Sequence, residues 1–229
     1  MKRTLSLIAT LFFLFQIAAV FAQENPPTIN EFTKDLAQET GFFNYYTDSD
    51  NGKIYLEIEK WNQPFIYVNY LSTGVGSNDI GLDRGQIGDT RLVHFERHGQ
   101  KVMLIQPNLT YRAGTENDRE KQSVDEAFAQ SVLWGGKVAA RTGERVLVDM
   151  EDFLLRDAHG VAERLKATGQ GGYRLDKARS APYLPQTMNF PDNTEFDAML
   201  TFGGDAAGVW IRSVTPTPDA VSVRMHHSF

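Results

Sequence analysis

The sequence has no cysteine among its 229 residues. This excludes disulfides, thiolate metal sites, iron–sulfur clusters and cysteine nucleophiles. Positive charge is also scarce, with 23 Lys and Arg against 29 Asp and Glu and a formal net charge of −6. A general nucleic-acid-binding protein needs a surplus of Lys and Arg to neutralise phosphates, so we expect no nucleic-acid partner.

Three common catalytic signatures are missing as well. The sequence has no His-Glu-x-x-His zinc motif, no phosphate-binding P-loop and no Gly-x-Ser-x-Gly nucleophile turn. A catalytic triad of serine, histidine and aspartate from distant positions stays possible, because such a triad is defined by its geometry and not by sequence spacing. The residues themselves therefore predict no catalytic residue and no cofactor in this chain.

The composition is that of a folded chain, with 41% hydrophobic and 23% charged residues. Its start has the pattern of a secretory signal peptide. Lys2 and Arg3 precede an apolar run over 5–20, and Ala22 offers a small residue for cleavage before Gln23. A membrane anchor is the alternative, but the run is short for a bilayer. We predict a signal peptide over 1–22, and export to the periplasm, cell envelope or extracellular space with no membrane span after cleavage.

After a polar leader predicted to be flexible over 23–40, with one short helical turn near 31–37, the pattern changes to alternation with period two. Such alternation is typical of strands with one buried face. It recurs over segments 53–60, 91–96, 101–106, 195–202 and 221–225, while 65–71 is apolar on both faces and predicts a central strand. We expect one mainly β domain over 41–229, an antiparallel sheet or sandwich.

One or two short helices are expected within this β domain. The strongest helical pattern covers 157–166, where Ala158, Val161 and Leu165 share one face. A capping-box pattern at 123–126 predicts a second helix after a polar loop over 114–122, although 131–134 fits a strand equally well. Residues 210–214 are predicted to be a strand.

Two motifs have competing interpretations. His94 and His98 have the spacing of zinc ligands on a helix, but this segment alternates like a strand. Residues four apart then lie about 13 Å apart along the strand, so a hairpin face is expected. The Asp48–Gly52 segment is similar to a calcium loop with its glycine one position early, and a hairpin turn is expected instead.

A long glycine-rich connection, 74–88, lies between two strong strands and contains Asp83 and Arg84. Loops of this length bind or cover something more often than simple hairpin turns do. The alternative is that Asp83 and Arg84 brace the loop through hydrogen bonds. His226 and His227 follow the last predicted strand, and adjacent strand residues point to opposite faces, which disfavours a single metal site.

Four stretches together resemble a known family: the glycine-rich loop at 74–86, the segment 102–108, the segments 180–184 and 190–195, and the final residues 226–229. They resemble the non-catalytic N-terminal region of secreted, zinc-dependent, metzincin-type metalloprotease-like proteins of bacteria. The resemblance implies a catalytic zinc domain downstream and no zinc in this chain. It also implies that the chain is a fragment of a longer protein.

The function expected from this resemblance is that of a non-catalytic accessory domain. Its partner would be the downstream catalytic domain, with Asp83, Arg84, His226 and His227 as candidate interdomain contacts. The alternative is a stand-alone envelope module that binds peptide or glycan. A small hydrolase with a dispersed triad is a third possibility.

Overall fold

Strands dominate the computed structural model, which describes residues 26–229. Strand accounts for 44% and helix for 19%, which confirms the predicted mainly β fold. The predicted signal peptide lies outside the described residues. Within 26–229, none of the helices has the length and apolar character needed to cross a membrane.

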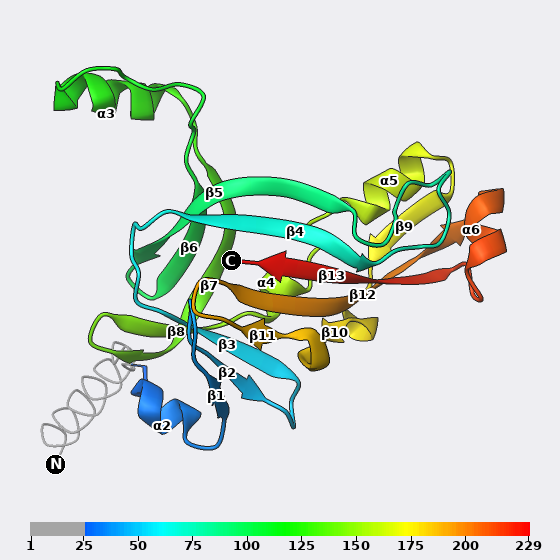
Figure 1. The fold of residues 1–229 in the computed structure, drawn as a ribbon, viewed down its shortest axis with the longest axis horizontal. Helices are drawn as coiled ribbons and strands as arrows, with labels where there is room; N and C mark the ends of the chain where they lie inside the picture. Colours follow the sequence, from blue (N-terminus) through cyan, green and yellow to red (C-terminus); the bar gives the residue numbers. More distant parts are fainter. Residues whose placement is uncertain (1–25) are drawn as a thin grey trace, which may run out of the picture.

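The strands form one antiparallel sheet that curls into a nearly closed barrel (Figure 1). Across the sheet the order is β1 (Ala37–Glu39), β2 (Tyr45–Asp48), β3 (Lys53–Ile58), β8 (Arg145–Asp149), β7 (Ser131–Thr142), β6 (Lys101–Gln106), β5 (Ile87–His98), β4 (Phe65–Thr73), β13 (Ala220–Ser228), β12 (Thr194–Ala206) and β10 (Ala181–Pro182). Two further strands, β9 (Gly171–Leu175) and β11 (Met188–Asn189), pair with β12.

Contacts between the segment before β2 and the β11–β12 side of the sheet bring its two ends together. The backbone N–H of Phe42 donates to the carbonyl of Phe190 at 2.8 Å, and that of Phe43 donates to Thr194 Oγ1 at 3.0 Å. The rings of Tyr45 and Phe196 pack edge to face with centroids 5.4 Å apart. The two ends of the sheet are thus joined through side chains and a short stretch of backbone.

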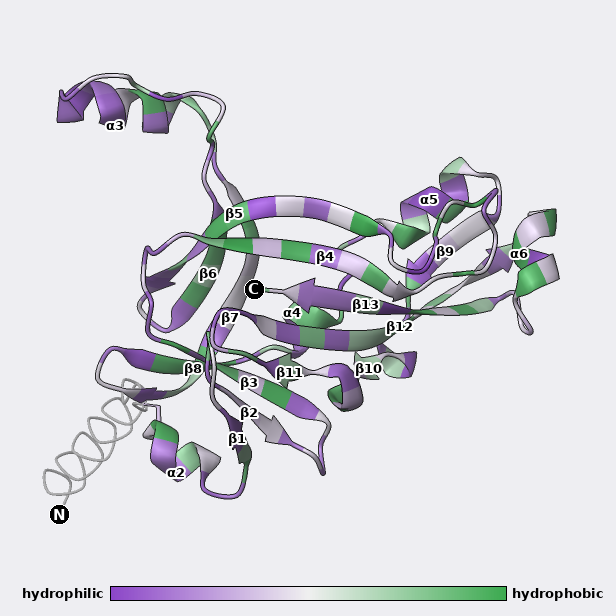
Figure 2. Cartoon of the chain, viewed as in Figure 1, coloured by the Kyte–Doolittle hydropathy of each residue, from purple (hydrophilic) through white to green (hydrophobic). Residues whose placement is uncertain are grey.

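Aromatic rings fill the barrel. Phe229 packs against Phe65 at 5.5 Å, Phe153 at 5.3 Å and Phe196 at 5.7 Å between centroids. All four rings are buried, and burial of each is worth about 1.5–3 kcal/mol. Figure 2 shows hydrophobic and hydrophilic residues alternating along the strands. This pattern turns Phe65 of β4 and Phe196 of β12 inward, whereas Phe153 comes from α4 and Phe229 follows β13.

Five short α-helices occur in the described part, more than the one or two expected. They are α2 (Ile29–Thr33), α3 (Asp118–Ala127), α4 (Glu151–Leu154), α5 (Val161–Ala167) and α6 (Val209–Val214), and there are two 3₁₀ turns, η1 (Lys177–Arg179) and η2 (Leu184–Gln186). The helix α5 confirms the strongest helical prediction. The Asp157 carboxylate accepts hydrogen bonds from the backbone N–H groups of Val161 and Ala162 at its start.

Two predictions at helices were wrong, a strand at 210–214 and a loop over the whole of 114–122. The predicted strand at 210–214 is α6, because the Gln170 side chain accepts a hydrogen bond from Ile211 N–H at 3.0 Å and fixes the first turn. The predicted polar loop at 114–122 contains the start of α3. This helix is capped by Asn117, and residues 123–126 lie inside it.

The predicted flexible leader also needs correction over residues 28–39. Thr28 and Glu31 form a capping box at the start of α2, and Ile29 is only 1% exposed. Ile29 packs in a small cluster with Tyr46, Ala140 and Leu147. Burial of this apolar side chain holds the segment against the sheet, and β1 then pairs with β2.

Candidate functional site

The strand β13 carries two adjacent histidines whose side chains lie on opposite faces of the sheet. His227 is fully buried in the barrel, with Nδ1 2.9 Å from the Tyr67 hydroxyl. Because Arg156 donates to that hydroxyl oxygen at 3.0 Å, the hydroxyl hydrogen is directed to His227. Burial lowers the pKa of His227 well below its usual value, so the ring is neutral.

His226 lies on the other face between two carboxylates. Its Nε2 is 2.5 Å from Glu195 and its Nδ1 is 3.3 Å from Asp197, while its ring stacks on Tyr70 with centroids 4.4 Å apart. Burial lowers the pKa of His226, but the hydrogen bonds to Asp197 and Glu195 outweigh it and raise that pKa above its usual value. Burial raises the pKa of Glu195, but the hydrogen bonds that Glu195 accepts from His226, Ser228 and Asn193 outweigh burial, so the pKa of Glu195 is lowered.

Two serines complete this cluster, but neither contacts the imidazole. Ser72 donates to Asp197 at 2.6 Å and Ser228 donates to Glu195 at 2.7 Å. Both ring nitrogens of His226 already face carboxylates, so neither is free to take a proton from a serine. The cluster therefore ties β4, β12 and β13 together and lacks the serine–histidine contact of a hydrolase triad.

These contacts correct the expectation that His226 and His227 face another domain. Their exposed fractions are 4% and 0%, so neither ring is available at the surface. The sequence did not reveal Glu195 and Asp197 as partners of His226. The alternation along β12 predicts that Asp197 lies on the opposite face of the strand from the buried Phe196. It does not predict which residue of β13 lies beside Asp197, because neither strand alone contains the register of the pair.

Asp83 and Arg84, the other two candidates, lie at the surface of the glycine-rich loop between β4 and β5. The loop is closed by its backbone, with Val75 N–H donating to the Leu82 carbonyl at 2.9 Å. A Cβ at Gly74 would lie 2.3 Å from that carbonyl oxygen, so the approach requires glycine. Within residues 26–229 the side chains of Asp83 and Arg84 make no hydrogen bond or ion pair, while the Asp83 carbonyl accepts from Gln86 N–H at 3.1 Å, so Asp83 supports the loop through its backbone.

Beside this loop lies α6, whose apolar side chains are unusually exposed. Val209, Trp210 and Val214 are 74%, 38% and 37% exposed, and we call them, with Asp83 and Arg84, the tip surface. The loop, α5 and α6 lie at the same end of the molecule (Figure 1), and Arg164 of α5 donates to the Ile80 carbonyl of the loop at 2.5 Å. A groove of about 500 Å³ separates the start of the loop from the α6–β13 connection and is lined by Gly74, Val75, Val214–Thr217 and Ala220–Ser222.

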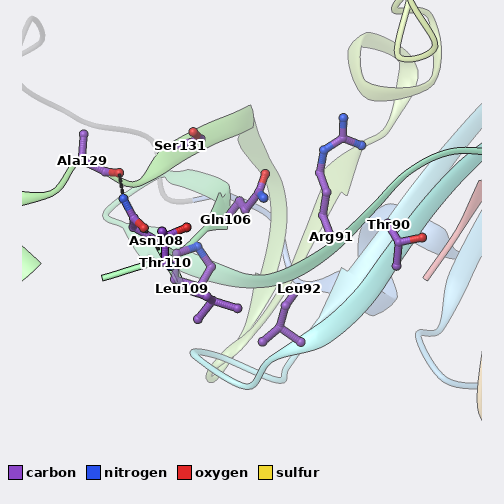
Figure 3. Close-up of a pocket in the computed structure, with 10 residues that line it drawn as sticks. Thr90, Arg91, Leu92, Gln106, Asn108, Leu109, Thr110, Ala129 and Ser131 are labelled. Atoms are coloured by element: carbon purple, nitrogen blue, oxygen red, sulfur yellow. Dashed lines mark hydrogen bonds between the residues drawn. The ribbon is translucent and has the colours of Figure 1, made fainter. Parts of the chain in front are cut away.

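A second groove, of about 360 Å³, follows β5 at the other side of the molecule, and we call it the edge groove (Figure 3). It is bounded by the projecting arm, residues 107–130, which leaves the sheet between β6 and β7 and carries α3 with no buried residue (Figure 1). The lining of the edge groove is mostly polar and uncharged, and Leu92 and Leu109 contribute apolar contacts. The lining residues are Thr90, Arg91, Leu92, Gln106, Pro107, Asn108, Leu109, Thr110, Ala129 and Ser131. The sequence did not reveal this groove, because it depends on where β6 and β7 separate.

The two motifs with metal-like spacing form local hydrogen bonds. Both His94 and His98 contact Glu96, at 2.9 and 3.1 Å, along one face of β5. In the described residues, no three His, Asp or Glu side chains are grouped so as to hold a metal ion. At the second motif Asp48 accepts from Asn51 N–H at 3.0 Å, and the expected hairpin turn between β2 and β3 is confirmed.

Comparisons with known proteins give two family matches. Residues 26–74 match a domain of unknown function, DUF5118, and residues 85–229 match a second one, DUF5117. The unmatched stretch between them falls in the glycine-rich loop, yet β4 from the first segment pairs with β5 and β13 from the second. No curated protein and no solved structure matches the chain. Because the second match covers more than half of the sequence, the chain belongs to the DUF5117 family of domains of unknown function.

Proposed function

We propose that this protein is a non-catalytic accessory domain that binds another protein domain through the tip surface. In the context predicted from its sequence, the partner is the downstream catalytic domain of a secreted, zinc-dependent metalloprotease-like protein of bacteria. The observation that carries the proposal is the exposure of Val209, Trp210 and Val214 on α6, at the same end of the molecule as the glycine-rich loop with the exposed Asp83 and Arg84 (Figure 1). An exposed apolar group with charged residues at its rim is typical of a protein contact.

The titratable clusters support the same assignment. His226 is occupied by Glu195 and Asp197, and His227 is neutral inside the barrel. Each cluster links strands of the sheet, His226 with Glu195 and Asp197 of β12 and His227 with Tyr67 of β4. The zinc expected from the family resemblance would then be held by the downstream domain, and the apolar run at 5–20 would direct export of the protein.

The test compares two polypeptides, residues 26–229 and the same residues joined to the sequence encoded downstream of Phe229. We expect the shorter form to associate with itself at high concentration and the longer form to remain monodisperse in light scattering, because the tip surface is covered. In the longer form, the double variant Trp210→Ser and Arg84→Ala should release the second domain from the tip surface. An added protease should then cleave the domain junction faster than in the unmodified longer form. Ile66→Ser, an exposed residue of β4 far from the tip in sequence and fold, is the matched control.

A shorter form that stays monomeric, together with a longer form indifferent to Trp210→Ser and Arg84→Ala, would rule out docking at the tip surface. The alternative function, a stand-alone module that binds peptide or glycan in the cell envelope, is favoured by a different feature, the edge groove. Its ligand can be inferred from the backbone of β5.

A further inference from the structure

Half of β5 has a neighbour on only one side. Residues 94–98 pair with β6, but β6 ends at Gln106, where the projecting arm begins. Residues 87–93 pair with β4 alone, and no backbone hydrogen bond joins Ile87–Leu92 to residues 107–131. The edge groove lies along this unpaired stretch.

The backbone groups that face the groove can be identified from the register. The carbonyl of Phe95 accepts from Asn62 N–H, so odd-numbered residues of β5 face the β4 side. The even-numbered His94, Glu96 and His98 lie opposite β6 residues in the hairpin. Because backbone groups alternate along a strand, Thr90 and Leu92 direct their N–H and C=O groups toward the open edge.

The chemistry of the lining suits an uncharged ligand. Arg91 is the one charged side chain lining the edge groove, and it pairs with Asp89 and donates to Asn69 at 3.1 Å. The side chains of Thr90, Gln106 and Ser131 make no hydrogen bond within residues 26–229 and line the groove. Leu92 and Leu109, 37% and 44% exposed, give it an apolar wall.

The length of the open edge is limited at both ends. A bulge interrupts the β4–β5 pairing between Thr90 and Ile87, and the arm closes the other end beyond Leu92. Bulges restrict pairing at sheet edges, so the edge does not offer a long template for aggregation. A short strand fits the space between bulge and arm, and a volume of about 360 Å³ is within the range of specific ligand sites.

We propose that the edge groove binds a short, extended, uncharged peptide segment by strand addition to Thr90–Leu92. The peptide backbone pairs with the free N–H and C=O groups of Thr90 and Leu92. One apolar peptide side chain packs on Leu92 and Leu109, while Gln106 hydrogen-bonds to the peptide amides. This site is separate from the tip surface and does not depend on docking there.

The test uses the ¹⁵N-labelled protein and a blocked pentapeptide of alternating threonine and valine. At saturation we expect the amide hydrogens of Thr90 and Leu92 to exchange about tenfold more slowly, because they become bonded. The same peptide N-methylated at alternate residues, which cannot pair with a strand edge, should cause no protection. Leu109→Ala and Gln106→Ala should each raise the Kd about fivefold, whereas Met199→Ala, an exposed apolar residue of β12 that does not line the groove, should leave it unchanged.

Three outcomes would overturn the inference. The peptide could fail to bind, or the N-methylated peptide could bind equally well, which would exclude backbone pairing. A neutral oligosaccharide such as maltotetraose could perturb Gln106 and Ser131 while the peptide does not, which would assign the groove to a glycan. None of these results bears on the tip surface, whose test reads association and junction cleavage.

Discussion

At the scale of single residues, His226 shows how a polar group can be buried when its neighbours compensate it. Its ring has two carboxylate partners and an aromatic neighbour, so its charge is compensated inside a mostly closed environment. Removing one member of such a group lowers the free energy of unfolding strongly, because the remaining charges stay buried without their partner.

Replacement of His226 should expose this role. We expect His226→Gln to lower the free energy of unfolding by about 3–5 kcal/mol at pH 6, because Glu195 and Asp197 lose their shared cation. The mutation should also remove a pH dependence. The raised pKa of His226 stabilises the fold fully below pH 6.5, its usual value, and this contribution is lost as the pH rises through the folded-state pKa.

Chemical denaturation between pH 6 and pH 9 measures both effects. The wild-type protein should lose stability across this interval, and His226→Gln should show a flatter profile. His98→Gln is the matched control, because His98 is exposed and contacts a single carboxylate, Glu96. Equal slopes for wild type and His226→Gln would show that the ring carries no excess charge in the folded state.

At the scale of elements, the packing of α2 against the sheet is the clearest difference from what the sequence suggests, because a short helical turn near 31–37 was expected only within a flexible leader. Local polarity over 23–40 favours a flexible leader, and a five-residue helix is not stable alone. Its stability comes from Ile29, which fills a site formed by Tyr46, Ala140 and Leu147, residues distant in sequence. No local pattern could reveal this contact.

We therefore predict that Ile29→Ala destabilises the protein by about 2–4 kcal/mol, as expected for a large-to-small change at a buried site. Thermal unfolding monitored by circular dichroism would measure the loss. Lys34→Ala, at the exposed end of the same helix, should have little effect. If the two variants melted alike, the segment would be a leader with no structural role.

The strands were easier to predict than the helices for a physical reason. Alternation along β3, β6, β12 and β13 reports a buried face directly, and these strands were located correctly. The sequence of α6 is rich in β-branched and aromatic residues, which favour strands, and its helical turn depends on the distant Gln170. Candidate sites were harder still: Asp83 and Arg84 lie at the surface as expected, whereas the partners of His226 and the edge groove depend on strand register and on the end of β6.

At the scale of the whole molecule, the two matched segments form a single sheet. The strand β4 belongs to the first segment and lies between β5 and β13 of the second. Its side chains Tyr67 and Leu71 are fully buried. Neither segment contains the strand neighbours that the other needs.

Residues 85–229 expressed alone should therefore fail to unfold cooperatively, because β5 and β13 lack their common partner. Differential scanning calorimetry should show no transition for this segment and a single transition for residues 26–229. Addition of residues 26–84 as a separate chain should restore the transition. A sharp transition for 85–229 by itself would mean that the second family segment folds independently.

The position of β4 also sets the order of events during synthesis. It leaves the ribosome about 150 residues before β13, its second neighbour in the sheet. In the folded sheet, Tyr70 of β4 pairs with His226 of β13. Until β13 appears, one edge of β4 stays unpaired and the aromatic core lacks Phe229. Such non-local pairing slows folding to milliseconds or longer and leaves an incomplete sheet exposed during translation. Completion of this sheet thus waits for β13, and a chaperone that shields β4 until then would raise the yield of folded protein.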